Sequence, residues 1–293
     1  MQFLTYLING ISLGSVYAII ALGYTMVYGI AKMLNFAHGD VIMLGSYIVF
    51  MCVSALNLPA GVAILVGVIV CTALGMTIEK IAYKPLRRAT NLAVLITAIG
   101  VSYFLQNIAL LVFGSNPVSF PSVVSWSGLS LFGGELTISG PAIVTIVACI
   151  VIMIALMSFV KYTKPGRAMR AVSEDKDAAM LMGINVNATI SLTFAIGSGL
   201  AAVAGALLCS SYPSLTPYTG SMPGIKAFTA AVFGGIGSIP GALLGGLLLG
   251  IIEILAKAYI SSQLADAIVF AVLIIVLLVK PSGILGKTVR EKV

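Results

Sequence analysis

The sequence alternates long apolar stretches with short polar segments. Eight stretches have the length of a membrane-spanning helix, about 17–25 residues, and they cover residues 9–30, 37–56, 60–82, 91–113, 138–160, 188–210, 240–259 and 263–280. A ninth stretch, 222–239, is shorter and is interrupted by glycine and proline. Backbone groups in lipid must be hydrogen-bonded internally, and no stretch alternates as a membrane β-strand does. The pattern predicts an all-α polytopic membrane protein. We expect one domain over residues 1–293, a bundle of eight to nine transmembrane segments with at least one short or broken helix.

The composition agrees with this pattern. Hydrophobic residues make up 60% of the 293 residues and charged residues only 9%, whereas a soluble domain carries about 25% charged residues. The first residues lack a basic stretch and a cleavage site, so no removable signal peptide is expected. Four cysteines lie apart in apolar stretches, at positions 52, 71, 149 and 209. We therefore expect buried thiols, with neither disulfides nor a metal site.

The net charge of +7 is explained by membrane topology, without a nucleic-acid partner. Most basic residues lie in the loops 80–90 and 161–187 and in the segment after residue 280, which the positive-inside rule places in the cytoplasm. The connections 56–60, 114–137 and 211–221 contain no Lys or Arg and should face outward. These assignments require 222–239, or its equivalent, to cross the membrane. The amino terminus then lies outside and the carboxyl terminus inside.

A cluster of polar residues precedes the second apolar segment. Asn35, His38 and Asp40 surround Gly39, and polar groups at membrane depth indicate function. Asn35 is a candidate helix cap, and the helix amino terminus that it caps could receive a carboxylate. The alternative is a helix end near the cytoplasm whose polar groups satisfy one another.

The interrupted segment 222–239 is a second candidate for the transport pathway. Gly224, Gly235 and Gly237 favour unwound backbone, as at transporter binding sites. Lys226 either extends to the surface or pairs with an acid elsewhere in the bundle. The complete set of predicted pathway residues is Asn35, His38, Asp40, Gly224, Lys226, Gly235 and Gly237.

Two isolated acids and a set of spaced glycines complete the membrane pattern. Glu79, near the basic inner loop, should have either a lipid-interface or an ion-pair role, and Glu253 could pair with Lys257 one turn further on. Glycines repeat at helical spacing, as in Gly10/Gly14, Gly237/Gly241/Gly245 and Gly246/Gly250. Such spacing lets helices pack closely, although 237–250 could instead line a moving pathway or a subunit seam.

The loop 161–187 differs from the apolar segments. Pro165 and Gly166 should end the preceding helix, and Ser173 should cap a new one that Gly183 stops. Acidic residues begin this helix and an apolar patch follows. The residues expected to contact a partner are Arg170, Ser173, Glu174, Asp175, Asp177, Met180, Leu181, Met182 and Gly183. The alternative is that the patch packs on its own bundle or on the bilayer.

The chain contains no Gly-x-x-x-x-Gly-Lys-Ser/Thr nucleotide loop, so we expect no enzymatic activity from it alone. A secondary transporter could instead carry protons through His38, Asp40 and Glu253, whereas a purely structural scaffold would not need polar groups in the membrane.

The chain resembles LivH-type permeases of branched-chain amino-acid ABC importers over nearly its whole length. The resemblance rests on four segments, at 34–40, 166–171, 233–241 and 280–286. It implies alternating access driven by two separate cytoplasmic ATPase chains, which hold ATP and Mg, and it makes the helix after Arg170 the coupling helix. It also implies a second homologous permease, an extracytoplasmic substrate-binding protein, a location in the bacterial inner membrane among its lipids, and no cofactor bound by this chain. Permeases for urea or short-chain amides have similar signatures and remain an alternative.

Overall fold

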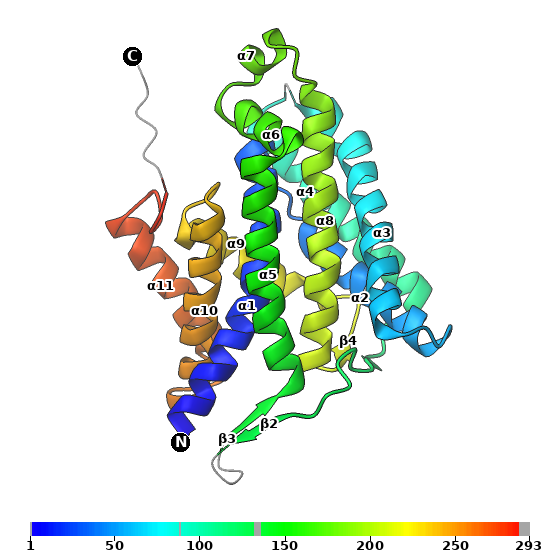
Figure 1. The fold of residues 1–293 in the computed structure, drawn as a ribbon, viewed down its shortest axis with the longest axis vertical. Coiled ribbons are helices and arrows are strands. Elements are labelled where there is room, and N and C mark those ends of the chain that lie inside the picture. The colour runs from blue at the N-terminus through cyan, green and yellow to red at the C-terminus, as the bar shows by residue number, and fades with distance from the viewer. Residues whose placement is uncertain (1, 88, 132–135, 287–293) are drawn as a thin grey trace.

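The computed structural model describes residues 2–87, 89–131 and 136–286 and shows a bundle of helices (Figure 1). The helices are α1 (Gln2–Ala31), α2 (His38–Ser54), α3 (Ala60–Ile78), α4 (Asn91–Phe113), α5 (Gly140–Tyr162), α6 (Lys164–Glu174), α7 (Lys176–Leu181), α8 (Val186–Ser211), α9 (Ser221–Gly234), α10 (Ile239–Tyr259) and α11 (Ala265–Val279). A π-helical turn, η1 (Glu79–Tyr83), and a 3-10 turn, η2 (Lys84–Leu86), continue α3.

Four short strands form two antiparallel pairs. Strand β1 (Val118–Ser119) pairs with β4 (Ser214–Leu215), and β2 (Gly128–Leu131) pairs with β3 (Leu136–Ser139). All four lie at the end of the bundle opposite α6 and α7 (Figure 1).

Six helical stretches of the described chain are long and apolar enough to span a membrane: α1, α3 with its continuation to Leu86, α4, α5, α8 and α10. Helices α2 and α11 have 17 and 15 residues, and α9 has only 14. The expected helical membrane bundle with short helices is therefore present. The structure has fewer long apolar spans than the sequence has predicted segments, because parts of those segments are non-helical chain or short helices.

Close packing between α1 and α10 forms one side of the core. A Cβ atom added to Gly14 would lie 2.8 Å from the carbonyl oxygen of Gly246, and one added to Gly10 would lie 2.9 Å from Cα of Ile251. The glycine repeats on α1 and α10 therefore let the two backbones touch, as predicted from their spacing. Helix α8 packs in the same way on α2 and α3. A Cβ atom at Gly45 of α2 would lie 2.7 Å from Cα of Ala202, and one at Gly75 of α3 would lie 3.0 Å from the carbonyl oxygen of Phe194.

The order of a long helix, a short helix and a long helix occurs twice, as α1–α2–α3 and as α8–α9–α10. In both cases a non-helical segment that ends in a turn, 32–37 or 212–220, precedes the short helix. The two sets run in opposite directions, with α1 packed on α10 and α3 packed on α8 (Figure 1). Helix α9 occupies most of the interrupted stretch 222–239, and its 14 residues are fewer than a full membrane span needs.

The two described basic loops lie at one end of the molecule, in agreement with the positive-inside rule, while the predicted basic positions 287, 290 and 292 lie outside the described residues. Helices α6 and α7 lie at this end, near the close of α1, and α1 begins at the opposite end (Figure 1). We call the end that carries α6 and α7 the cytoplasmic end. Thr163 begins α6 by accepting a hydrogen bond from the Gly166 amide, one residue after α5 ends. The predicted break is confirmed, and it falls at Thr163, with Pro165 and Gly166 in the first turn of α6.

The packing of α1 on α10 predicts the effect of one added methyl group. Gly14→Ala should lower the free energy of unfolding by about 1–3 kcal/mol, because the new Cβ overlaps the α10 backbone. Gly100→Ala is the control, since a Cβ there meets no described atom within 4 Å. The measurement is the thermal unfolding of the purified chain in detergent. Equal midpoints for the two variants would contradict the α1–α10 contact.

Candidate functional site

Helices α2 and α9 both begin inside the bundle, where their first turns touch. A Cβ atom at Gly39 would lie 2.7 Å from the carbonyl oxygen of Gly220, and one at Gly224 would lie 2.9 Å from Cα of Gly39. Both positions require glycine because the backbones are in contact. The structure thus brings His38, Asp40 and Gly224 together, although they are nearly two hundred residues apart in sequence. We call the first turns of α2 and α9 the central site.

Asp40 is a buried carboxylate of the central site. Its Oδ1 accepts a hydrogen bond of 2.8 Å from Nε2 of Gln106 on α4, and the same Nε2 lies 3.3–3.4 Å from the hydroxyls of Ser102 and Ser221. Its Oδ2 has no hydrogen-bond partner among the residues that the structure describes. The first turn of a helix favours a negative charge. With Oδ2 unpaired among the described residues, this carboxylate presents a free acceptor inside the bundle.

His38 lies beside Asp40 in a largely aromatic environment. Its ring packs edge-to-face on Tyr24 with 4.6 Å between centroids, and Tyr24 in turn packs on Phe228 of α9. The imidazole is 1% exposed, and within the described ranges its Nε2 has no partner. His38 therefore joins α1 to the start of α2.

Asn35 does not cap α2, which corrects the prediction from the sequence. The helix starts three residues later, with Ala37 at the cap position and no side-chain cap bond. The Asn35 side chain instead accepts a 2.9 Å hydrogen bond from the hydroxyl of Tyr83 in η1. A partner 48 residues away outcompetes the local cap, and it fixes the non-helical segment 32–37.

Lys226 pairs with acids in the bundle. Its Nζ lies 2.9 Å from Oε1 of Glu253 and 2.6 Å from Oδ1 of Asp266, and it is 6% exposed. Lys257 also contacts Glu253 Oε1 at 2.5 Å, and the Tyr17 hydroxyl donates to Oε2 at 2.8 Å. The predicted Glu253–Lys257 pair is confirmed. Sequence reasoning missed Tyr17 and Asp266.

This ionic network occupies α1, α9, α10 and α11, whereas Asp40 is bonded to α4. A cavity of about 220 Å³ adjoins the network and is lined in part by Tyr212, Thr219, Glu253 and Lys257. The carboxylate of Glu253 is held by two ammonium groups and one hydroxyl. These three groups stabilise the negative charge of the Glu253 carboxylate.

Gly235 and Gly237 lie apart from the central site, in the turn between α9 and α10. Both have positive φ angles, of 105° and 92°, which glycine adopts readily. A Cβ atom at Gly237 would lie 3.8 Å from Cα of Gly29, near the end of α1. The structure therefore divides the predicted pathway residues between the bundle interior and the cytoplasmic end.

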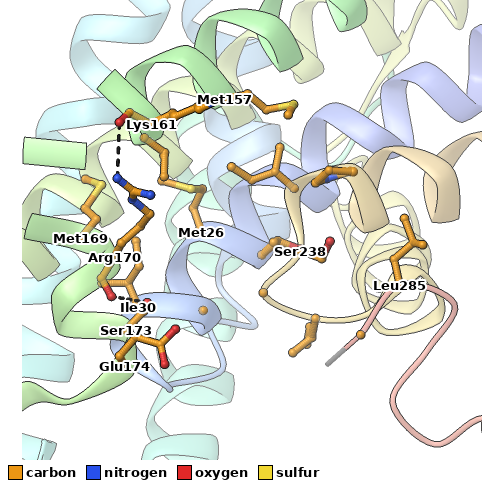
Figure 2. A pocket seen from close by; sticks show the side chains of 18 of the residues that line it. Met26, Ile30, Met157, Lys161, Met169, Arg170, Ser173, Glu174, Ser238 and Leu285 are labelled. Carbon is orange, nitrogen blue, oxygen red and sulfur yellow. Dashed lines mark hydrogen bonds between the residues drawn. The ribbon is translucent and has the colours of Figure 1, made fainter. Parts of the chain in front are cut away.

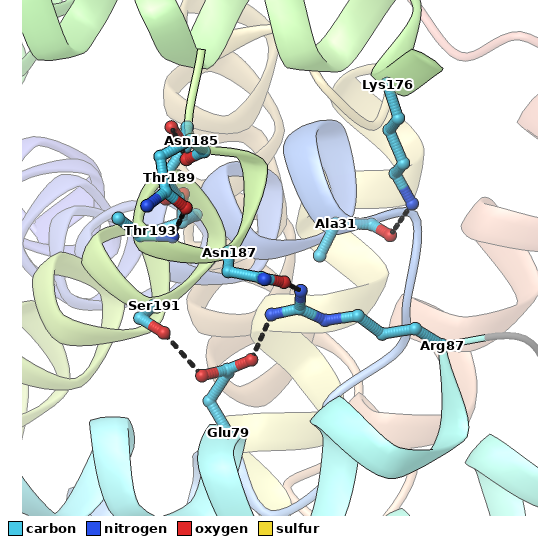
Figure 3. Close-up of polar contacts among 10 residues, drawn as sticks. Ala31, Glu79, Arg87, Lys176, Asn185, Asn187, Thr189, Ser191 and Thr193 are labelled. Carbon is cyan, nitrogen blue, oxygen red and sulfur yellow. Dashed lines mark hydrogen bonds and ion pairs between the residues drawn. The ribbon is translucent and has the colours of Figure 1, made fainter. Parts of the chain in front are cut away.

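A polar network at the cytoplasmic end connects η1 with α8 (Figure 3). Glu79 pairs with Arg87, so of its two expected roles the ion pair is present, and it accepts a 2.5 Å hydrogen bond from Ser191. Arg87 also donates to Asn187. The buried Glu79 carboxylate is thus fully engaged, and π-helical turns such as η1 are frequent at functional positions.

Lys176 of α7 reaches the end of α1 in the same region (Figure 3). Its Nζ donates a 2.8 Å hydrogen bond to the carbonyl oxygen of Ala31, where the partial negative charge of the helix end attracts a cation. Burial lowers the pKa of Lys176, and the positive charges of Arg87 and Lys32 lower it further.

Helices α6 and α7 replace the single helix expected after Ser173. Ser173 lies inside α6 and donates to the Arg170 carbonyl oxygen, so its predicted role as a cap is wrong. Asp175 caps α7 instead, accepting from the amides of Asp177 and Ala178 at 2.8 and 2.9 Å. The Asp175 carboxylate accepts from the first free amides of α7. Because the cap lies two residues after Ser173, α6 can continue to Glu174.

The predicted apolar patch of α7 lies on the surface. Met180, Leu181 and Met182 are 58%, 89% and 82% exposed, and Gly183 ends the helix with a φ of 80°. Arg170 and Glu174, in contrast, turn toward a cavity of about 930 Å³ between α1, α5 and α6 (Figure 2). The residues expected to contact one partner therefore occupy two separate surfaces.

A solved structure and several known proteins are similar to this chain. PsaBC from Streptococcus pneumoniae, in complex with Fab, matches 96% of this chain and 93% of its own with 15% identity and a TM-score of 0.49. The permease protein LivH of the high-affinity branched-chain amino acid transport system of Salmonella typhimurium is 48% identical over 100% of this chain and 98% of its own length.

Two further relatives have the same kind of description. BraD of Pseudomonas aeruginosa, from another high-affinity branched-chain amino acid transport system, is 46% identical over 100% of this chain and 98% of its own. A probable LivH of Methanocaldococcus jannaschii is 32% identical over 92% and 88%. The family model described as the permease component of branched-chain amino acid transport systems matches residues 6–277. The chain belongs to this family of transport permeases.

Proposed function

We propose that this chain is the membrane permease subunit of an ABC importer for branched-chain amino acids. The observation that carries the proposal is the full-length similarity to LivH and BraD, both permeases of such transport systems. The chain is a multi-pass protein of the bacterial inner membrane, in keeping with its six long apolar spans. The fold supports the role through two short helices that begin inside the bundle, as transport sites often do.

The partners follow from this role. Two cytoplasmic ATPase subunits supply ATP and Mg, an extracytoplasmic protein delivers the substrate, and a second homologous permease completes the pathway. The exposed patch Met180–Met182 is the contact with an ATPase subunit, because an apolar patch at the tip of a polar loop is stabilised by a partner groove. Methionine suits a groove that repacks as the partner moves.

The central site is the part of the pathway that meets the substrate. The free Oδ2 of Asp40 is placed to accept a hydrogen bond from the ammonium group of an amino acid. Gln106 donates to Oδ1 and also contacts the Ser221 hydroxyl, and so fixes the orientation of the carboxylate. An ammonium group gains more from this carboxylate than the neutral N–H donors of urea or an amide do, and a proton-coupled carrier would have no use for α7.

Movement of α7 reaches the central site through the segment 31–37. Lys176 attaches α7 to Ala31, where α1 ends. The next residue, Lys32, has a φ of 58°, an unfavourable conformation for a residue with a side chain. Tyr83 holds Asn35 at the middle of the segment, and His38 begins α2. A shift of α7 therefore acts on a short non-helical segment whose other end carries the site.

Charges placed on α7 should break the contact with the ATPase. Met180→Glu combined with Leu181→Glu should reduce uptake by the assembled transporter at least about 30-fold, the effect of losing an interface hot spot. Membrane insertion should not change, because both residues are exposed. The measurements are copurification of the ATPase chains and uptake of labelled leucine. Leu181→Met is the control, and normal uptake by the double variant would contradict the assignment.

Removal of the Lys176 hydrogen bond should separate ATP hydrolysis from transport. Lys176→Met should lower the substrate transported per ATP about tenfold, as expected for the loss of a charged hydrogen bond of roughly 1.5–3 kcal/mol. ATPase binding should persist, because the α7 patch is intact. Lys176→Arg can still donate to the Ala31 carbonyl and should retain most of the coupling. An unchanged ratio of substrate to ATP in Lys176→Met would refute this path.

Neutralising Asp40 should affect charged substrates selectively. Asp40→Asn retains an oxygen acceptor for Gln106 but loses the charge, so leucine uptake should fall about tenfold or more. Uptake of a neutral amide, if measurable, should change little. The measurement compares both substrates in proteoliposomes, with and without a proton gradient. Equal losses for the two substrates, or dependence on the gradient, would argue against the ammonium contact.

A further inference from the structure

A large cavity at the cytoplasmic end lies apart from the central site, although Lys32 of the segment 31–37 lines it. It has a volume of about 930 Å³, and its walls come from α1, α5, α6 and the turn between α9 and α10 (Figure 2). It contains neither Met180–Met182 nor any residue of the central site. We call it the α1–α5–α6 cavity.

The lining of this cavity combines positive charge with apolar surface. The lining includes three basic residues, Lys32, Lys161 and Arg170, and one acid, Glu174. Between them lie apolar side chains, including Met26, Met157 and Met169 (Figure 2). The net positive charge at the cytoplasmic end selects an anion, and the apolar walls select a ligand that also carries hydrocarbon.

An unsatisfied hydroxyl in the wall also indicates a missing ligand. Thr25 lines the cavity and is 2% exposed, and its Oγ1 has no hydrogen-bond partner in the part of the chain that is described. Buried polar groups almost always have a partner. An ester or hydroxyl oxygen of a bound molecule would supply one.

The cavity continues onto the membrane-facing surface of α5. Met157 lines the cavity and is 41% exposed, and Ile154 and Ile150 are exposed on the same face at helical spacing. A hydrocarbon chain that leaves the cavity therefore meets apolar helix surface in the direction of the bilayer centre.

We propose that the α1–α5–α6 cavity binds an anionic phospholipid of the cytoplasmic leaflet. The phosphate lies among Lys32, Lys161 and Arg170, and the acyl chains follow the exposed face of α5. Charge complementarity and the position at the cytoplasmic end distinguish this occupant from a neutral lipid. Because Arg170 belongs to α6, which leads directly to α7, the lipid would stabilise the base of the proposed coupling helix.

The test is native mass spectrometry of the full-length chain released from micelles with equal amounts of phosphatidylglycerol and phosphatidylcholine. The unaltered chain should retain phosphatidylglycerol in preference. Lys161→Gln combined with Arg170→Gln should weaken that retention about 30-fold, since each basic residue near an anionic lipid contributes about 1 kcal/mol, or roughly a fivefold change. Lys80→Gln is the control, because it removes the same charge from an exposed residue of η1 that does not line the cavity.

Met157→Trp is a second variant that keeps every charge and fills the cavity. It tests lipid binding even if the double variant does not fold. It should also reduce retention of phosphatidylglycerol. The proposal is overturned if both lipids are retained equally, or if the preference for phosphatidylglycerol survives in the variants that do fold. It is also overturned if a structure of the assembled transporter places a protein segment in the cavity.

Discussion

The contact between the first turns of α2 and α9 is the constraint on which the rest of the structure depends. Gly39 and Gly220 meet backbone to backbone, so two helices can begin in the middle of the bundle instead of at its surface. Helix starts carry free N–H groups and a partial positive charge. Only a protein interior that shields these groups from lipid can hold them at that depth. The long helices α1 and α8 provide that shield, which is why they are the most buried spans.

Polar residues in the bundle fall into two kinds. The carboxylates of Glu253 and Glu79 have partners on both oxygens, and their ion pairs hold helices together. Asp40 and His38 each retain a buried atom without a partner among the described residues. Such atoms are costly in a static core. Their presence at the junction of α2 and α9 accords with a site that receives another molecule.

Local signals in the sequence predicted much of the fold. The apolar run 91–113 coincides with α4, Gly183 ends α7, and Glu253 pairs with Lys257 one turn away. Predictions failed where a competing partner was available. Ser173 and Asn35 both have cap chemistry, but Asp175 suits the start of α7 better, and Tyr83 takes the Asn35 side chain.

Contacts between distant segments were beyond the reach of sequence patterns. Gln106 binds Asp40 across 66 residues, and Lys226 finds Asp266 on another helix. Neither pairing follows from a periodicity or residue spacing in the sequence, because both pairings depend on how the helices pack together. The division of Gly224 from Gly235 and Gly237 has the same origin. All three lie in one apolar stretch, yet α9 carries the chain from the bundle interior to the cytoplasmic end.

The central claim is that α7 and the start of α2 move together through the segment 31–37. Its most direct test is fluorine NMR of the assembled transporter, with one fluorine label at Met180 and a fluorinated phenylalanine at Phe36, which packs on Phe228. The account predicts that ATP binding shifts both signals with the same dependence on nucleotide concentration. A shift at Met180 with no change at Phe36 would contradict it.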